Sequence, residues 1–367
     1  MSIEHNECNI DIGNCYLDDQ RGRCVLVVYF PILKGREGEM KAISNVDEAL
    51  IPHIVPVFEV PPGNVRGPVQ DAYAFIQRAQ EAIPPNMTIA VDARHLSEPH
   101  EGIRRPLRDI ASDLHGWGIP VLPVAHLDDT PDRLTDVGFA AALHGGQAIV
   151  RLGNDSADPD DKEAEAKLSY VLKGAGLRTE NCALILDVFE IRSERDVTRV
   201  EPIVRKCISW AQQYPWQSII VAAGAMPETI SHLPTNIATP IRRWDLELWR
   251  RVQELAVDYG DYGIAHPGMA HGRWAPMPSL RYTDSDVWWT YRWAKDGNGN
   301  APMYDLCKAL TAADHWPPEG RGYSWGDGEI ALRAIGNAGP GNATSWRAWG
   351  TSHHLAYVSA QTRGGRD

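Results

Sequence analysis

The sequence predicts an eight-stranded parallel α/β barrel, (β/α)8, with a Trp- and Gly-rich C-terminal elaboration. Short β-branched runs recur eight times, a longer amphipathic run follows each of the first seven, and the repeat is about 30 residues, the size of a βαβ unit. Continuous apolar strands suit a parallel sheet that is buried on both faces. Eight successive units favour a closed barrel over the alternative, a doubly wound open sheet. The turn Lys34-Gly-Arg36 also lacks the glycine pattern of an open dinucleotide-binding sheet.

The expected strands and helices alternate along residues 25–265, which we interpret as the barrel core. The strand patterns are Val25–Leu33, His53–Val60, Thr88–Asp92, Pro120–Ala125, Ala148–Leu152, Cys182–Val188, Ser218–Ala223 and a weak eighth, Tyr259–Ile264. The helical patterns are Glu37–Leu50, Val69–Ala82, Pro106–Trp117, Asp132–His144, Asp161–Gly174, Val197–Tyr214 and Arg242–Ala256.

The βα rhythm stops after about residue 265, where Gly, Pro, Trp and Asn become dense. We expect a strand or hairpin at Arg281–Arg292, helices at Met303–Ala312 and Asp327–Arg333, and a closing helix at Trp346–Ala360. Residues 266–367 are expected to cover the barrel mouth and to complete the last unit. Seven tryptophans in this region are expected to form a small hydrophobic core: Trp288, Trp289, Trp293, Trp316, Trp325, Trp346 and Trp349.

Composition limits the class of protein. The net charge of −12 argues against a nucleic-acid polymer as partner, because non-specific binding needs a basic surface. No apolar stretch reaches the roughly 18 residues of a membrane span, and residues 1–24, a separate leader, lack the apolar core of a signal peptide. The six cysteines form no C-x-x-C pair and are expected to be free thiols. We therefore expect a soluble, cytoplasmic protein.

Several stretches carry a family resemblance. They are Tyr29–Glu39, Pro56–Glu59, Asp258–Pro267, Leu280–Thr283, Gly326-Asp327, and Trp346 through His353-His354. In combination they make the chain, from Val25 onward, resemble the bacterial and phage "beta protein" family. The resemblance implies no settled chemistry. It implies an accessory gene of bacteria or phages, sometimes near conflict or defence loci.

Charged residues recur where the predicted strands end, which is where such barrels carry their sites. We expect Glu59, Asp92 and Asp187 to be catalytic, either as general acid and base or as ligands of a Mg²⁺ cofactor. The expected substrate-binding residues are Lys34, Arg36, Arg94, Arg151, Tyr262 and His354. The alternative is that ion pairs between strand ends only close the barrel. His126 and Asp128 also follow a predicted strand but are not assigned a role.

Two functions of different classes are consistent with these patterns. The first is a hydrolase or lyase that acts on a small anionic substrate, phosphate- or nucleotide-like, bound at the C-terminal barrel mouth, in phage–host conflict. The second is a non-catalytic sensor that recognises a protein or peptide partner in antiphage defence. A closed polar pocket with converging carboxylates would favour the enzyme, whereas an open aromatic surface would favour the sensor.

Overall fold

The computed structural model describes residues 28–63, 67–97, 104–153, 163–269, 277–295, 297 and 299–364; the predicted leader, residues 1–24, lies outside them. Eight parallel strands close into a barrel, in the order β1-β2-β3-β4-β5-β6-β7-β9. Their bounds are Tyr29–Leu33, Val57–Glu59, Ile89–Asp92, Val121–His126, Ala148–Gly153, Cys182–Glu190, Ser218–Gly224 and Asp258–Asp261. The predicted (β/α)8 barrel is therefore confirmed, with β9 as the weak eighth strand.

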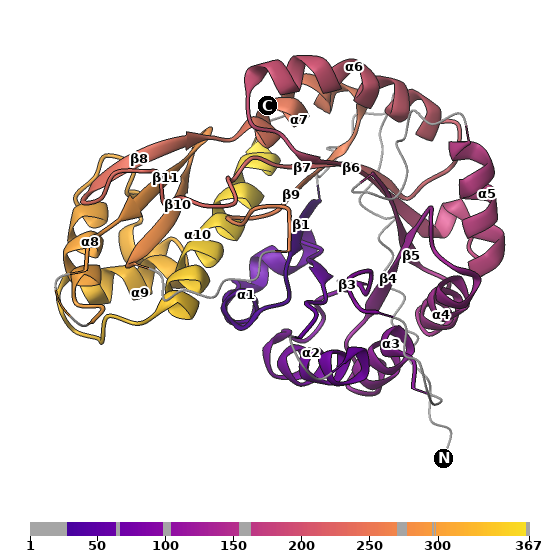
Figure 1. Ribbon diagram of the computed structural model, residues 1–367, viewed down its shortest axis with the longest axis horizontal. Helices are drawn as coiled ribbons and strands as arrows, with labels where there is room; N and C mark the ends of the chain where they lie inside the picture. The colour runs from indigo at the N-terminus through magenta and orange to yellow at the C-terminus, as the bar shows by residue number, and fades with distance from the viewer. Residues whose placement is uncertain are drawn as a thin grey trace.

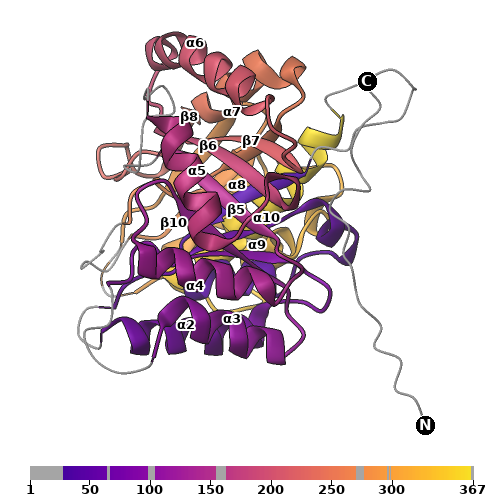
Figure 2. The same cartoon turned by 90° about the vertical axis from the view of Figure 1, so that its right-hand side faces the viewer.

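Helices surround this barrel (Figure 1). They are α1 (Glu37–Ile43), α2 (Pro68–Ala82), α3 (Pro106–Gly116), α4 (Pro131–Ala142), α5 (Ala164–Ala175), α6 (Glu194–Ala211) and α7 (Trp244–Val252). Figure 2 shows α2 to α6 stacked along one side of the molecule. Prolines begin α2, α3 and α4, where a missing N–H costs nothing. The Thr130 and Ser193 side chains accept hydrogen bonds from the first turns of α4 and α6.

The alternation of side chains along each strand separates two cores. Small and branched residues such as Val57, Ala90, Val124, Ile149 and Ile185 fill the interior of the barrel. The other faces of the strands pack against the helices in a larger apolar layer. The described residues therefore fill the barrel interior, and polar side chains gather where the strands end.

The Trp-rich region forms a lobe beside the barrel (Figure 1). Its antiparallel sheet has the order β10-β11-β8, formed by Ser279–Asp284, Val287–Arg292 and Ile237–Arg242, and α8 (Pro302–Thr311) and α9 (Trp325–Ala334) pack together beside it. Trp346 and Trp349 are buried in the lobe core, and Trp289, Trp293, Trp316 and Trp325 pack against it. The expected tryptophan core is thus confirmed for these six. Trp288 instead packs with Met226 and Ile264, next to the barrel.

Helix α10 (Ala343–Gly364) connects the lobe to the barrel. It packs against α1 of the barrel and against α9 and β10 of the lobe. Figure 1 shows it running from the lobe to the barrel wall. Contacts on several sides explain why no single face of α10 is apolar.

The structure differs from the predicted elements in two places. The expected helix Glu37–Leu50 ends at Ile43, and a separate 3-10 helix, Glu48–His53, follows it, with Pro52 inside. Strand β8 was not predicted, and it lies within residues 25–265 although it joins the lobe sheet.

Among the described residues, no helix combines the length and the apolar character needed to cross a bilayer. Cys182, Cys207 and Cys307 are buried free thiols, as expected.

Candidate active site

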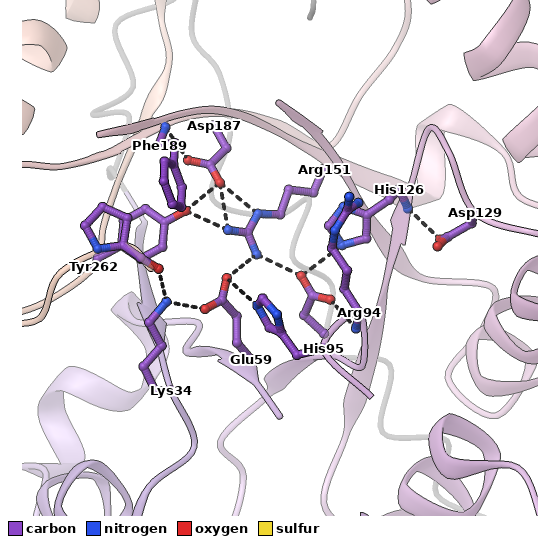
Figure 3. Close-up of polar contacts among 12 residues, drawn as sticks. Lys34, Glu59, Arg94, His95, His126, Asp129, Arg151, Asp187, Phe189 and Tyr262 are labelled. Atoms are coloured by element: carbon purple, nitrogen blue, oxygen red, sulfur yellow. Dashed lines mark hydrogen bonds and ion pairs between the residues drawn. The ribbon is translucent and has the colours of Figure 1, made fainter. Parts of the chain in front are cut away.

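Seven polar side chains from seven neighbouring strand ends meet at the C-terminal mouth of the barrel. All are at most 4% exposed: Lys34, Glu59, Asp92, His126, Arg151, Asp187 and Tyr262. The parallel register sets their neighbours, because it pairs Glu59 with Asp92 and His126 with Arg151. Figure 3 labels six of them, all but Asp92, and marks the contacts that connect them. We call this set the mouth cluster.

Arg151 is the centre of the mouth cluster. Its Nε and Nη2 donate to Asp187 Oδ2 at 3.0 and 2.7 Å, and Nη2 also donates to the Tyr262 hydroxyl at 2.7 Å. Its Nη1 donates to Asp92 Oδ2 at 2.8 Å and lies 2.9 Å from Glu59 Oε1. A guanidinium has five N–H donors in a fixed plane, and these contacts occupy all three of its nitrogens. Arg151 therefore organises three carboxylates at once.

Lys34 forms a second arm of the cluster. Its ammonium group pairs with Glu59 Oε2 and donates to the carbonyl oxygen of Pro267, and it lies 4.7 Å from the centre of the Tyr262 ring. Pro267 belongs to the segment after β9, so this contact ties that segment to the barrel. The Tyr262 hydroxyl donates to Asp187 Oδ2 at 2.6 Å and closes the ring of contacts.

Electrostatics keep Glu59 and Asp92 ionised although both are buried. Burial favours the neutral acid, but Arg151 and Lys34 outweigh it and hold the pKa of Glu59 at about 2. Burial is likewise outweighed at Asp92, where His126 and Arg151 lower the pKa well below its usual range. Burial raises the pKa of the Tyr262 hydroxyl, which stays a neutral donor. Three carboxylates and two cations leave the cluster with a net charge of −1 when His126 is neutral.

His126 joins the cluster from the end of β4. Its Nε2 lies 2.9 Å from Asp92 Oδ2, and its backbone N–H donates to Asp129. The other oxygen of Asp92 accepts the backbone N–H of Arg94 at 2.9 Å. His126 is not among the site residues predicted from the sequence. The alternation of side chains along the strand could have identified it, because His126 shares the inward face of β4 with Leu122 and Val124.

Two predicted binding residues lie at the edge of the mouth. The Arg94 side chain forms a two-bond pair with Asp128 at 2.9 and 3.1 Å, and it keeps 21% of its surface exposed. Arg36 is at the start of α1, and its side chain contacts Met269 Sδ at 3.8 Å. The structure therefore brings Lys34, Arg151 and Tyr262 together with the three carboxylates, and it places Arg94 and Arg36 outside them.

His354 belongs to a different buried network. Its Nε2 lies 3.0 Å from Asp261 Oδ2, and its Nδ1 lies 2.7 Å from the Thr283 hydroxyl. Both ring nitrogens are thus engaged between β9 of the barrel and β10 of the lobe. Its neighbour His353 bonds to Asp327 at 2.9 Å and to the Thr283 carbonyl at 2.8 Å. These residues come from the stretches that carry the family resemblance, and they join the lobe to the barrel.

The strand β6 ends with an irregular backbone beside the mouth cluster. Its register with β7 shifts between Asp187 and Glu190, and Phe189 has a φ of 66°, in the left-handed region. A non-glycine residue in that region stores backbone strain, which is concentrated at functional sites. The Phe189 N–H donates to Asp187 Oδ1 at 2.9 Å, so the distortion fixes the Asp187 carboxylate.

A small cavity adjoins the mouth cluster between α3 and α4. Its volume is about 40 Å³, and its polar lining includes Arg94, Ser97, His126, Asp129 and Arg133. Within the described part of the chain, no three His, Cys, Asp or Glu side chains are grouped as metal ligands. Glu59, Asp92 and Asp187 are instead arranged around Arg151.

Comparisons with solved structures give remote matches. Triosephosphate isomerase from Bartonella henselae is 11% identical, with a TM-score of 0.35, over 63% of this chain and 90% of that one. A type I 3-dehydroquinate dehydratase from Clostridium difficile is 12% identical, with a TM-score of 0.38, over 67% and 87%. Dihydropyrimidinase from Brevibacillus agri is 11% identical, with a TM-score of 0.31, over 65% and 57%.

No curated protein matches the chain. The sequence profile described as "Beta protein" matches residues 29–360, which include the whole barrel and nearly all of the lobe. The chain therefore belongs to the Beta protein family.

Proposed function

We propose that this protein is an enzyme, a hydrolase or lyase, that acts on a small anionic substrate at the C-terminal mouth of its barrel. One observation carries the proposal: the carboxylates of Glu59, Asp92 and Asp187, at the ends of β2, β3 and β6, are buried and fixed around Arg151. Burying charges is costly, and apolar side chains would fill the mouth at lower cost. Polar groups concentrated at this end of a (β/α)8 barrel are typical of a reaction site.

The contacts assign different tasks to the cations. Arg151 and Lys34 are occupied by carboxylates, so they are suited to organise the site. Arg94 is suited to bind the anion, because its partner Asp128 is 45% exposed and an exposed pair contributes only about 0–1 kcal/mol. An anionic group can therefore replace Asp128 at little cost. A phosphate fits the two-pronged geometry of a guanidinium.

The test is a thermal-shift screen of nucleotides and phosphorylated metabolites. A ligand at 100 times its dissociation constant should add about 2.7 kcal/mol, which raises the melting temperature of a chain of this size by about 4 °C. Arg94→Ala should weaken binding about 10- to 100-fold, the value of a hydrogen bond to a charged group. Arg178→Ala is the matched control, because Arg178 forms an exposed pair with Glu180 just before β6, at the opposite end of the barrel.

A second function, a non-catalytic sensor of a protein partner in phage–host conflict, is favoured by a specific observation. Each carboxylate of the mouth cluster already has a cation, which is also how a purely structural network would look. In addition, Leu332 and Ile335, at the end of α9, are 37% and 69% exposed. A flat response in the ligand screen, with Arg94→Ala unchanged, would favour this function over the enzyme.

A further inference from the structure

The two nitrogens of the His126 imidazole have different surroundings. Nε2 lies 2.9 Å from Asp92 Oδ2, whereas Nδ1 is buried and has no hydrogen-bond partner among the described residues. His126 itself is only 1% exposed. A buried polar nitrogen without a partner is costly, so such an atom calls for a water, a ligand or a chemical role.

The contact with Asp92 sets which nitrogen carries the proton. An ionised carboxylate only accepts, so Nε2 must donate to it. In a neutral imidazole, Nδ1 then keeps its lone pair and can accept a proton. Asp92 is itself held by Arg151 and by the backbone N–H of Arg94, at 2.8 and 2.9 Å, which fixes the orientation of the ring.

The cavity beside His126 has the size of a site for water. Its volume of about 40 Å³ has room for about three water molecules. Arg94, whose guanidinium we assign to the anion, is one of the residues that line the same cavity. Water, imidazole and anion contact would therefore lie side by side.

We propose that His126 is the general base of a phosphate-ester hydrolysis, that the attacking water lies in this cavity, and that Asp92 is the positioning residue. The inference rests on the proposed function and narrows "hydrolase or lyase" to a hydrolase. Nδ1 takes a proton as the water oxygen forms a bond to phosphorus. The bond from phosphorus to the leaving oxygen breaks, and that oxygen takes the proton from the imidazolium. The products are inorganic phosphate, or a phosphate monoester from a diester, and an alcohol.

The test combines spectroscopy and turnover on the full chain. NMR of the ¹⁵N-histidine-labelled protein reports the protonated nitrogen, and the His126→Gln spectrum assigns the signal. Turnover is measured with p-nitrophenyl phosphate and bis(p-nitrophenyl) phosphate, and binding is measured with inorganic phosphate. Glutamine keeps a donor toward Asp92 and lacks the base. His144→Gln is the matched control, because His144 also has a buried, unpartnered nitrogen but follows α4, away from the mouth.

We expect a proton on Nε2 and none on Nδ1 at pH 7.5, and we expect His126→Gln to lose about 10²- to 10⁴-fold in turnover while it still binds phosphate. Added imidazole should partly restore turnover to His126→Ala, which a structural role would not allow. A proton on Nδ1, or equal turnover by His126→Gln, overturns the inference and leaves the proposed function. Phosphate binding without hydrolysis of either ester also overturns it, in favour of a lyase. If phosphate does not bind and neither ester reacts, the proposed function fails, and the inference fails with it.

Discussion

Replacing Glu59 by glutamine perturbs the mouth cluster with almost no change in shape. Glu59 is fully buried, and it pairs with Lys34 and with Arg151 Nη1, the latter at 2.9 Å. Glutamine removes the negative charge, so Lys34 loses its carboxylate partner and Arg151 keeps only Asp92 and Asp187. Breaking a buried pair in this way costs about 3–5 kcal/mol. We therefore expect Glu59→Gln to lower the free energy of unfolding by that amount at pH 7.

The pH dependence gives an independent magnitude. Lys34 and Arg151 outweigh burial and lower the pKa of Glu59 from 4.5 to about 2 in the folded protein. A lowered pKa in the folded state stabilises the protein above the unfolded pKa, and this stability is lost as the pH falls from about 4.5 to about 2. At 1.36 kcal/mol per pKa unit, the carboxylate contributes about 3 kcal/mol at neutral pH. The difference between wild type and Glu59→Gln should therefore shrink as the pH falls toward 2.

Urea unfolding, followed by tryptophan fluorescence between pH 7 and pH 3, measures both effects. Glu254→Gln is the control, because Glu254 pairs with Arg205 at 2.6 Å on the surface, where its side chain is 57% exposed. The control should match wild type across the range. A Glu59→Gln protein within 1 kcal/mol of wild type at pH 7, with a pH-independent difference, would refute this reasoning.

Two further predictions concern the lobe. Asp261→Asn removes the charge that faces His354 at 3.0 Å, where β9 of the barrel meets β10 of the lobe. We expect about 3–5 kcal/mol of destabilisation and faster hydrogen exchange in both strands. Faster exchange confined to the lobe would show that this contact does not stabilise the barrel strand. Gly326→Ala would place a methyl group 2.1 Å from the Trp349 carbonyl oxygen, so we expect a loss of about 1–3 kcal/mol by calorimetry. Gly116→Ala, where a methyl group meets nothing within 4 Å, is its control, and equal melting temperatures for the two variants would contradict the packing.

The barrel could be predicted because its signal is local and repeated. Each strand is a short apolar run, and each helix is an amphipathic run, so the elements can be read one at a time. The missed strand β8 has neither property. It contains Pro240, each of its residues is partly buried or exposed, and its partner β11 is about 50 residues further along the chain. Only the tertiary pairing reveals it.

The positions of the candidate-site residues at the strand ends could be predicted from the sequence, but their side-chain contacts could not. Glu59, Asp92, Arg151 and Asp187 stood out because charged residues end successive strands. The sequence does not show that Arg151 occupies its three nitrogens with these carboxylates, or that the ring of His354 is engaged in the joint to the lobe. Those facts depend on rotamers and distances. The assignment of anion binding to Arg94 follows only from such facts.

The most direct test of the central claim is where an anion binds. Crystals soaked in tungstate, a phosphate analogue with a strong anomalous signal, would locate the site without knowledge of the substrate. The proposed function predicts a tungstate peak within hydrogen-bond distance of the Arg94 guanidinium, next to the cavity that His126 lines, and no such peak in Arg94→Ala. Tungstate bound only at distant surface sites, with the mouth cluster of the wild-type protein empty, would contradict an anion-binding active site at the barrel mouth.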